Sequence, residues 1–175
     1  MIEVINTLGP KQTDSYRAGR YWLSKNKLAG KIKLHTSFEG LLQNLDKYRG
    51  QLLLVPTAFK SEKLALDWGE LHYQNLDKLN LIDCFKYDLD ELVLVENKEV
   101  TSKKAYTHRA TISLLAQIDD IEIICVASKY EAYQRFIKDG RYVLTNQKNL
   151  GKLVSEVIIK HFSVSMIWAV YRIKE

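Results

Sequence analysis

The residues with the clearest chemical potential lie between the first apolar stretch of the chain and its first amphipathic stretch. Gly9 and Pro10 stop the opening strand, because proline cannot donate to a strand ladder and glycine accepts unusual dihedrals. Thr13–Ser15 follows, and all three residue types are good N-caps, so a helix should begin there. A strand, a tight turn and a helix N-terminus direct several backbone N–H groups at one place. The stretch Asn6–Ser15 therefore suits an anion, although an ordinary capped turn explains the same residues.

Composition narrows the class of molecule that this turn could serve. The chain has 175 residues, of which 46% are hydrophobic and 27% charged, as in globular proteins that bury a core. Its net charge of +5 is modest and spread out, which suits a small anion at least as well as nucleic acid. No apolar run reaches membrane length, and the N-terminus lacks the pattern of a signal peptide. We expect a cytoplasmic protein that binds neither nucleic acid nor membranes.

The two cysteines give no sign of a metal centre. Cys84 and Cys125 lie in apolar, strand-like stretches without CxxC or His–Cys spacing. This placement predicts buried free thiols. We expect neither a metal nor another cofactor.

The first third of the chain predicts a β-α-β-α-β order. Two stretches repeat apolar residues at helical spacing, and the stretches around them alternate or run apolar as strands do. The expected elements are strand Met1–Ile5, helix Asp14–Asn26, strand Lys31–Thr36, helix Phe38–Leu45 capped by Ser37, and strand Gln51–Val55. Right-handed crossovers bring the ends of such strands to one edge, where α/β proteins bind ligands. Thr57, just after Pro56, should therefore share an edge with the Gly9-Pro10 turn.

A second β-α-β-α-β pattern begins after residue 100. Before it lie a short helix or irregular cover and two extended pieces, and after it lie a polar helix and two strands. The expected elements are cover Ser61–Trp68, extended Asn80–Phe85 and Glu91–Glu96, strand Lys104–Thr107, helix Arg109–Ile118, strand Ile121–Val126, helix Lys129–Lys138, strand Tyr142–Leu144, helix Gln147–Leu153, and strands Glu156–Ile159 and Met166–Ile173. Gly140 should end the helix before it in the left-handed conformation.

Short motifs along nearly the whole chain resemble the catalytic domain of prephenate dehydratases. That family opens with Gly-Pro-x-Gly-Thr-(Phe/Tyr)-Ser, and Gly9–Ser15 is similar except at Gln12 and Asp14. The family's Val-Pro-Ile-Glu-Asn-Ser resembles Val55–Phe59, which lacks the polar tail, and its Ser-His-Pro resembles Thr107–Arg109. The resemblance implies an α/β, two-lobed periplasmic-binding-protein type II-like fold with a ligand cleft between the lobes. Lobe 1 would comprise about residues 1–84 and 163–175, and lobe 2 about residues 85–162.

The departures are similar to a subgroup of that family. Dehydratases carry Thr-Arg-Phe at the head of the last strand, where this chain has Ser165–Ile167, and Met166 cannot replace a guanidinium. The closing segment, together with Asn6–Pro10 and Leu144–Asn146, looks more like the non-aromatising prephenate decarboxylases of bacilysin (anticapsin) biosynthesis. The resemblance also implies a single domain without a regulatory ACT domain.

The resemblance implies a small anionic (di)carboxylate substrate, prephenate, and a possible homodimer. Two carboxylates require cations or convergent N–H donors, and loss of the ring carboxylate requires a proton donor. The candidate substrate-binding residues are Lys11, Thr13, Ser15, Arg17, Thr57, Arg109, Thr145, Asn146 and Met166. The candidate catalytic residues are Thr107, His108 and Ser165. His108 begins a helix, so a capping role is the alternative for it.

Three functions remain open on this reasoning. The first is a prephenate decarboxylase that gives a dihydro-4-hydroxyphenylpyruvate without aromatisation. The second is an aromatising dehydratase that uses Ser165, and the third is a non-catalytic protein that binds a small carboxylate. Asp14 bears on all three, because its carboxylate would repel the ligand unless it turns outward to cap the helix. We expect it to turn outward.

Overall fold

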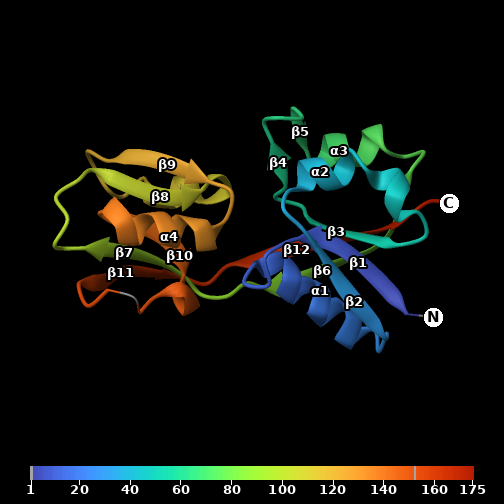
Figure 1. Cartoon of the computed structure of the whole chain (residues 1–175), viewed down its shortest axis with the longest axis horizontal. Helices are drawn as coiled ribbons and strands as arrows, with labels where there is room; N and C mark the ends of the chain where they lie inside the picture. The colour runs from blue at the N-terminus through green and yellow to red at the C-terminus, as the bar shows by residue number, and fades with distance from the viewer. Residues whose placement is uncertain (1, 152) are drawn as a thin grey trace. The chain divides into compact units, whose positions relative to one another are not determined.

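A computed structural model shows two compact units and describes residues 2–151 and 153–175 (Figure 1). Unit 1 comprises the chain up to Tyr87 together with Ser165–Glu175, and unit 2 comprises Asp88–Val164. No helix in the described residues is long and apolar enough to cross a membrane.

Unit 1 is built on a five-stranded sheet in the order β2-β1-β3-β12-β6 (Figure 1). These strands are β1 (Glu3–Leu8), β2 (Gly30–His35), β3 (Leu52–Pro56), β6 (Leu79–Asp88) and β12 (Ser165–Ile173). β1 runs parallel to β2 and β3, while β12 runs antiparallel to β3. The apolar run of β3 is fully buried between both faces, as its sequence predicts. Met1, the first residue of the expected opening strand, lies outside the described residues.

The helices of unit 1 begin at the predicted caps. α1 (Asp14–Lys25) starts after Thr13, whose side chain accepts from Tyr16 N, and α2 (Phe38–Leu42) starts after Ser37. α2 ends earlier than predicted, and a separate 3₁₀ helix, η1 (Leu45–Tyr48), follows it.

The expected cover over Ser61–Trp68 is instead a small hairpin of β4 (Lys60–Ser61) and β5 (Leu66–Asp67). It leads into α3 (Trp68–Gln74), a helix that the sequence reasoning missed. Asp67 and Glu70 form a capping box at its start, and this pattern is visible in the sequence.

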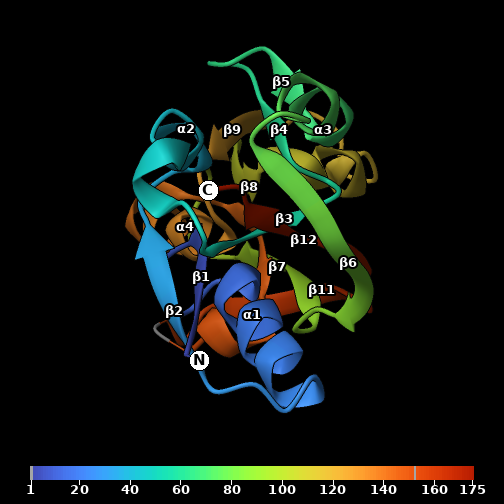
Figure 2. The ribbon, with the colours of Figure 1, turned by 90° about the vertical axis from the view of Figure 1, so that its right-hand side faces the viewer.

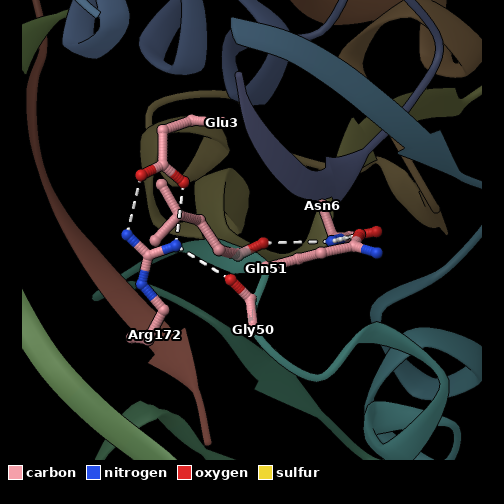
Figure 3. A network of polar contacts seen from close by, with 6 residues as sticks. Glu3, Asn6, Gly50, Gln51 and Arg172 are labelled. Carbon is pink, nitrogen blue, oxygen red and sulfur yellow. Dashed lines mark hydrogen bonds and ion pairs between the residues drawn. The ribbon is translucent and has the colours of Figure 1, made fainter. Parts of the chain in front are cut away.

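Polar contacts tie the strands of unit 1 together from within (Figure 3). The Arg172 guanidinium donates to both carboxylate oxygens of Glu3 at 2.8 and 2.9 Å, and to Gly50 O at 2.9 Å. Fully buried Asn6 donates to Gln51 Oε1 at 2.9 Å and to Leu52 O at 3.1 Å. These contacts join β1, β3 and β12.

Unit 2 has a five-stranded sheet in the order β11-β7-β10-β8-β9. Its elements are β7 (Leu92–Asn97), β8 (Lys104–His108), η2 (Arg109–Leu115), β9 (Glu122–Val126), α4 (Lys129–Asp139), β10 (Tyr142–Asn146), η3 (Gln147–Asn149) and β11 (Glu156–Phe162). β8 runs parallel to β9 and β10, and β7 runs antiparallel to β10 and β11. One core cluster holds Tyr133 and Phe136 of α4, both without solvent exposure.

Two helices predicted for unit 2 are shorter than expected and are 3₁₀ helices. The expected helix Arg109–Ile118 is the 3₁₀ helix η2, because β-branched and serine residues weaken its α-helical propensity. The expected helix Gln147–Leu153 is a three-residue 3₁₀ helix, and Lys152 within that range lies outside the described residues.

Gly140 does end α4, but the predicted left-handed conformation is wrong. Its φ is −84°, in the extended region. A Cβ there would lie 2.8 Å from Phe136 Cα and 2.9 Å from Tyr106 Cδ2. Glycine is needed for close approach rather than for its dihedral freedom.

The prediction of buried thiols is also wrong. Cys84 and Cys125 are both free and exposed. They lie on β6 and β9, which are edge strands of the two sheets. An edge strand is covered on fewer sides than a central strand, so an apolar sequence alone does not ensure burial there.

Candidate functional site

The first candidate surface, which we call rim 1, is the end of unit 1's sheet where β1, β2 and β3 finish. The register pairs Trp168 with Pro56, so the first residues of β12 extend past the end of β3. The predicted residues on this rim and the adjoining first turns of α1 are Lys11, Thr13, Ser15, Arg17, Thr57, Ser165 and Met166.

Thr13 serves the fold of this rim. Its hydroxyl lies 3.0 Å from Leu8 O and 2.8 Å from Pro10 O, and it accepts from Tyr16 N at 3.3 Å. These contacts fasten the end of β1 to the start of α1. Thr13 therefore fixes the direction of the helix, and any donors for an anion come from the groups around it.

The first turns of α1 carry charges of both signs. Asp14 and Arg17 are half-buried, Lys11 is exposed, and Ser15 is 5% exposed. A carboxylate in the first turn stabilises the helix through its dipole. Asp14 supplies this carboxylate, and its outward orientation stays a prediction.

The remaining predicted residues of rim 1 meet where β3 and β12 lie side by side. Thr57 donates to Ile167 O from its backbone N at 2.9 Å and from its hydroxyl at 3.2 Å. This contact positions Ser165 and Met166, with the serine exposed and the methionine half-buried. A hydroxyl and a thioether therefore share this part of the rim.

Two side chains on this rim were missed from the sequence. The indole Nε1 of Trp168 is buried and has no hydrogen-bond partner in the part of the chain that the structure describes. His35 ends β2, and its Nε2 lies 2.9 Å from Asn6 Oδ1. Burial, followed by the charge of Lys33, lowers the pKa of His35. His35 is the last residue of its strand, and Trp168 lies near the start of β12, where that antiparallel strand passes the end of β3.

The second candidate surface, rim 2, is the end of unit 2's sheet where β8, β9 and β10 finish. It holds the other predicted residues, namely Thr107, His108, Arg109, Thr145 and Asn146. β8 and β10 are neighbouring parallel strands, so their last residues lie next to one another.

Rim 2 also uses its hydroxyls internally. Buried Thr107 Oγ1 lies 2.8 Å from Thr111 Oγ1, which in turn donates to His108 O at 2.8 Å. Buried Thr145 donates to Lys129 O at 2.7 Å and accepts from Asn149 Nδ2 at 2.9 Å. Both threonines thereby fix the loops that follow their strands.

His108 is the N-cap of η2. Its Nδ1 accepts from Ala110 N at 3.3 Å, which places the proton of a neutral imidazole on Nε2. The capping role considered from the sequence is thus present. Arg109 beside it is exposed.

Across residues 2–151 and 153–175, no three His, Cys, Asp or Glu side chains gather closely enough to hold a metal ion.

Comparisons with known proteins establish the fold. No protein-family model matches the sequence, and no curated protein is significantly similar to it. The structure is similar to a prephenate dehydratase from Arthrobacter aurescens in complex with L-Phe, with a TM-score of 0.61 and 11% identity over 98% of this chain and 61% of that one. It is also similar to the prephenate dehydratase of Staphylococcus aureus, with a TM-score of 0.59 and 16% identity over 99% and 67%.

A binding protein shares the same architecture. The GluR0 ligand-binding core in complex with L-glutamate matches with a TM-score of 0.51 and 11% identity, over 99% of this chain and 84% of that one. The chain thus spans about three-fifths to two-thirds of the two dehydratases and more of the receptor core. The fold is α/β, prephenate dehydratase-like, and of the two-lobed periplasmic-binding-protein type II class.

Proposed function

We propose that the protein binds prephenate, or a closely similar small dicarboxylate, and removes the ring carboxylate as CO₂ without aromatisation. The bond between the quaternary ring carbon and the carboxylate breaks, and its electron pair spreads over the ring diene. A proton then adds to a ring carbon while the ring hydroxyl is retained. The product is a dihydro-4-hydroxyphenylpyruvate.

The observation that carries this proposal is the pairing of Ser165 with Met166 at rim 1. A dehydratase-like reaction is expected to need a cation at the second position, and a thioether provides none. Half-buried Met166 instead offers an apolar side chain at this position. A carboxylate that loses hydration against such a side chain is destabilised relative to CO₂, which favours decarboxylation.

The other groups have supporting roles in the proposal. The N-terminus of α1 and the cations Lys11 and Arg17 would hold the side-chain carboxylate of the substrate. His108 would deliver the proton to the ring carbon as the imidazolium, a form in which Nδ1 carries a proton and no longer accepts from Ala110 N. Thr107 and Ser165 remain the other candidate donors, and Arg109, Thr145 and Asn146 the other candidate contacts.

Product analysis tests the proposal. Purified protein is mixed with prephenate beside a control without protein, and the products are identified by NMR. A non-aromatic product that retains the ring hydroxyl supports decarboxylation, whereas phenylpyruvate supports the aromatising alternative. If prephenate is not consumed and does not change the thermal stability of the protein, the assignment of this ligand is contradicted.

His108→Asn separates catalysis from capping. Asparagine is a good N-cap, so η2 should keep its start, while the ionisable proton donor is lost. We expect a fall in turnover on the order of 10²-fold or more with little change in thermal stability. Unchanged turnover would leave His108 a capping residue.

A non-catalytic binding protein is the second candidate. It is favoured by the internal hydrogen bonds of Thr13, Thr107 and Thr145, which leave these hydroxyls committed to the fold. Thermal stabilisation by prephenate without turnover would support this candidate. Asp14→Asn should then increase affinity for the dianion, because it removes a like charge from the proposed anion site.

A further inference from the structure

The two edges of the unit 1 sheet are protected very differently. β2 carries exposed Lys31 and Lys33 at alternate positions, a common way to prevent an edge strand from pairing with another chain. β6, the opposite edge, is ten residues long, and Figure 2 shows it along the outer side of the unit. Its Leu81 and Ile82 are 37% and 41% exposed. The centre of this long edge therefore lacks the protection that β2 has.

Helix α3 of the same unit also carries an exposed aromatic side chain. Tyr73 is 74% exposed, and its ring packs edge-on against His72 at 5.3 Å. His72 Nδ1 lies 3.2 Å from the hydroxyl of Tyr171 on β12, the strand beside β6. Burial, with Cys84 of β6 as a second cause, raises the pKa of Tyr171 to about 12, so this hydroxyl stays neutral. His72 thus joins α3 to β12, the neighbour of β6.

We propose that β6 pairs antiparallel with β6 of a second copy of this chain, around a two-fold axis near Asp83. A second copy presents the same unpaired backbone edge, so the two edges can exchange hydrogen bonds over the length of the strand. The result is one continuous sheet across the dimer.

The sequence of β6 is complementary to itself in this register. Ile82 lies opposite Cys84 of the second copy, so exposed apolar side chains meet at the centre. Asn80 lies opposite Lys86, and Lys78, just before the strand, lies near Asp88 at its end. Polar and opposite charges therefore flank an apolar centre, as in specific protein interfaces.

One like-charge contact limits the strength of this pairing. Asp83 would lie opposite Asp83 of the second copy. Each carboxylate accepts a hydrogen bond from Trp22 Nε1 at 2.7 Å, which offsets part of its charge. This register therefore predicts that Asp83→Asn strengthens the dimer.

Analytical ultracentrifugation over a range of concentrations tests the interface. The full chain should form dimers, and Ile82→Lys should raise the dimer dissociation constant by roughly tenfold or more. Ile123→Lys on β9 is the matched control, because Ile123 is 40% exposed on another edge strand. It should leave the dimer unchanged, and circular dichroism should show both variants folded.

Disulfide crosslinking tests the register independently. Ile82→Cys should link to Cys84 of the second copy under copper-phenanthroline oxidation, because directly opposed residues have a suitable spacing. The double variant with Cys84→Ser should not link. A monomeric full chain at all concentrations, a dimer that Ile123→Lys dissociates, or a dimer weakened by Asp83→Asn would each overturn the proposal.

Discussion

The two sheets share one topology but place their long helix after different strands. In β2-β1-β3-β12 and in β9-β8-β10-β7, three parallel strands are followed by one antiparallel strand. In unit 1 the 12-residue α1 follows the first parallel strand, where unit 2 has the seven-residue η2. In unit 2 the 11-residue α4 follows the second, where unit 1 has the five-residue α2. The same strand order is therefore compatible with a long helix after either parallel strand. The two rims can thus carry different helices although the sheets have the same topology.

The units also differ in where their polar anchors lie. Unit 1 has them within the sheet, as in the contacts of Asn6 and Arg172 (Figure 3). Unit 2 has them on α4, where Asp139 at its end accepts from Tyr106 at 2.7 Å and Tyr133 in its middle pairs with Glu156. These particular contacts join strands in unit 1 and join α4 to its sheet in unit 2. Perturbing each anchor should therefore affect a different unit.

The largest effect should come from the helix anchor of unit 2. Phe136→Ala removes a ring with no solvent exposure and should lower the free energy of unfolding by about 3–5 kcal/mol. All three tryptophans lie in unit 1, so tryptophan fluorescence reports on that unit while far-UV circular dichroism reports on both. The circular dichroism transition should shift more than the fluorescence transition. Equal shifts would show that the two units unfold together and would end the comparison.

The next-largest loss of stability should come from breaking the Arg172–Glu3 contact of unit 1. Arg172→Met removes both hydrogen bonds to Glu3, whose side chain is 15% exposed, and should cost about 1–3 kcal/mol after allowance for partial exposure. The shift of the unfolding transition followed by tryptophan fluorescence measures this loss of stability. Arg135→Met, which removes an exposed pair on α4, should cost at most about 0.5 kcal/mol. Equal costs for the two variants would refute the special role of the anchor.

Gly140→Ala tests the close packing behind α4. The added methyl group would press on Phe136 and Tyr106, so we expect a loss of about 1–2 kcal/mol in chemical denaturation followed by circular dichroism. Gly40→Ala on α2 is the control, because its closest new contact is Ser37 Oγ at 3.3 Å. That substitution should be neutral or slightly stabilising. A stabilising effect at position 140 would contradict the packing explanation.

The smallest effect should be the pH response of unit 1 through His35. Its pKa is lowered, first by burial and then by Lys33, so folding favours the neutral imidazole. This contribution to stability is present above the unfolded pKa of about 6.5 and is lost as the pH falls through the folded value. Fluorescence-monitored unfolding between pH 5 and 8 should show this loss, and His35→Gln should reduce it. If His35→Gln keeps the full loss of stability at low pH, that loss comes from other groups.

Local sequence signals identified much of the fold. Thr13 and Ser37 cap their helices as predicted, because the capping hydrogen bond joins residues only three positions apart. The apolar run before Pro56 forms a strand buried on both faces. The capping box at Asp67 was equally local and was overlooked.

The properties of the rims depended on distant residues. The hydrogen bonds of Thr145 and His35 reach partners 16 and 29 residues away in the chain. No periodicity in the sequence reveals such partners, because they meet only when strands pair. The order of the candidate motifs was therefore visible, but their hydrogen bonding was not.

The sequence by itself determined the alternation of strands and helices, the starts of the capped helices and the likeness to prephenate dehydratases. Only the tertiary structure decided that Cys84 lies exposed on an edge strand, and that Gly140 is required by Phe136 and Tyr106 rather than by its own dihedral angles. The physical reason is the range of the interactions. Caps and hydrophobic periodicity act over a few residues, whereas burial at a sheet edge and close packing are set by strands far apart in the chain.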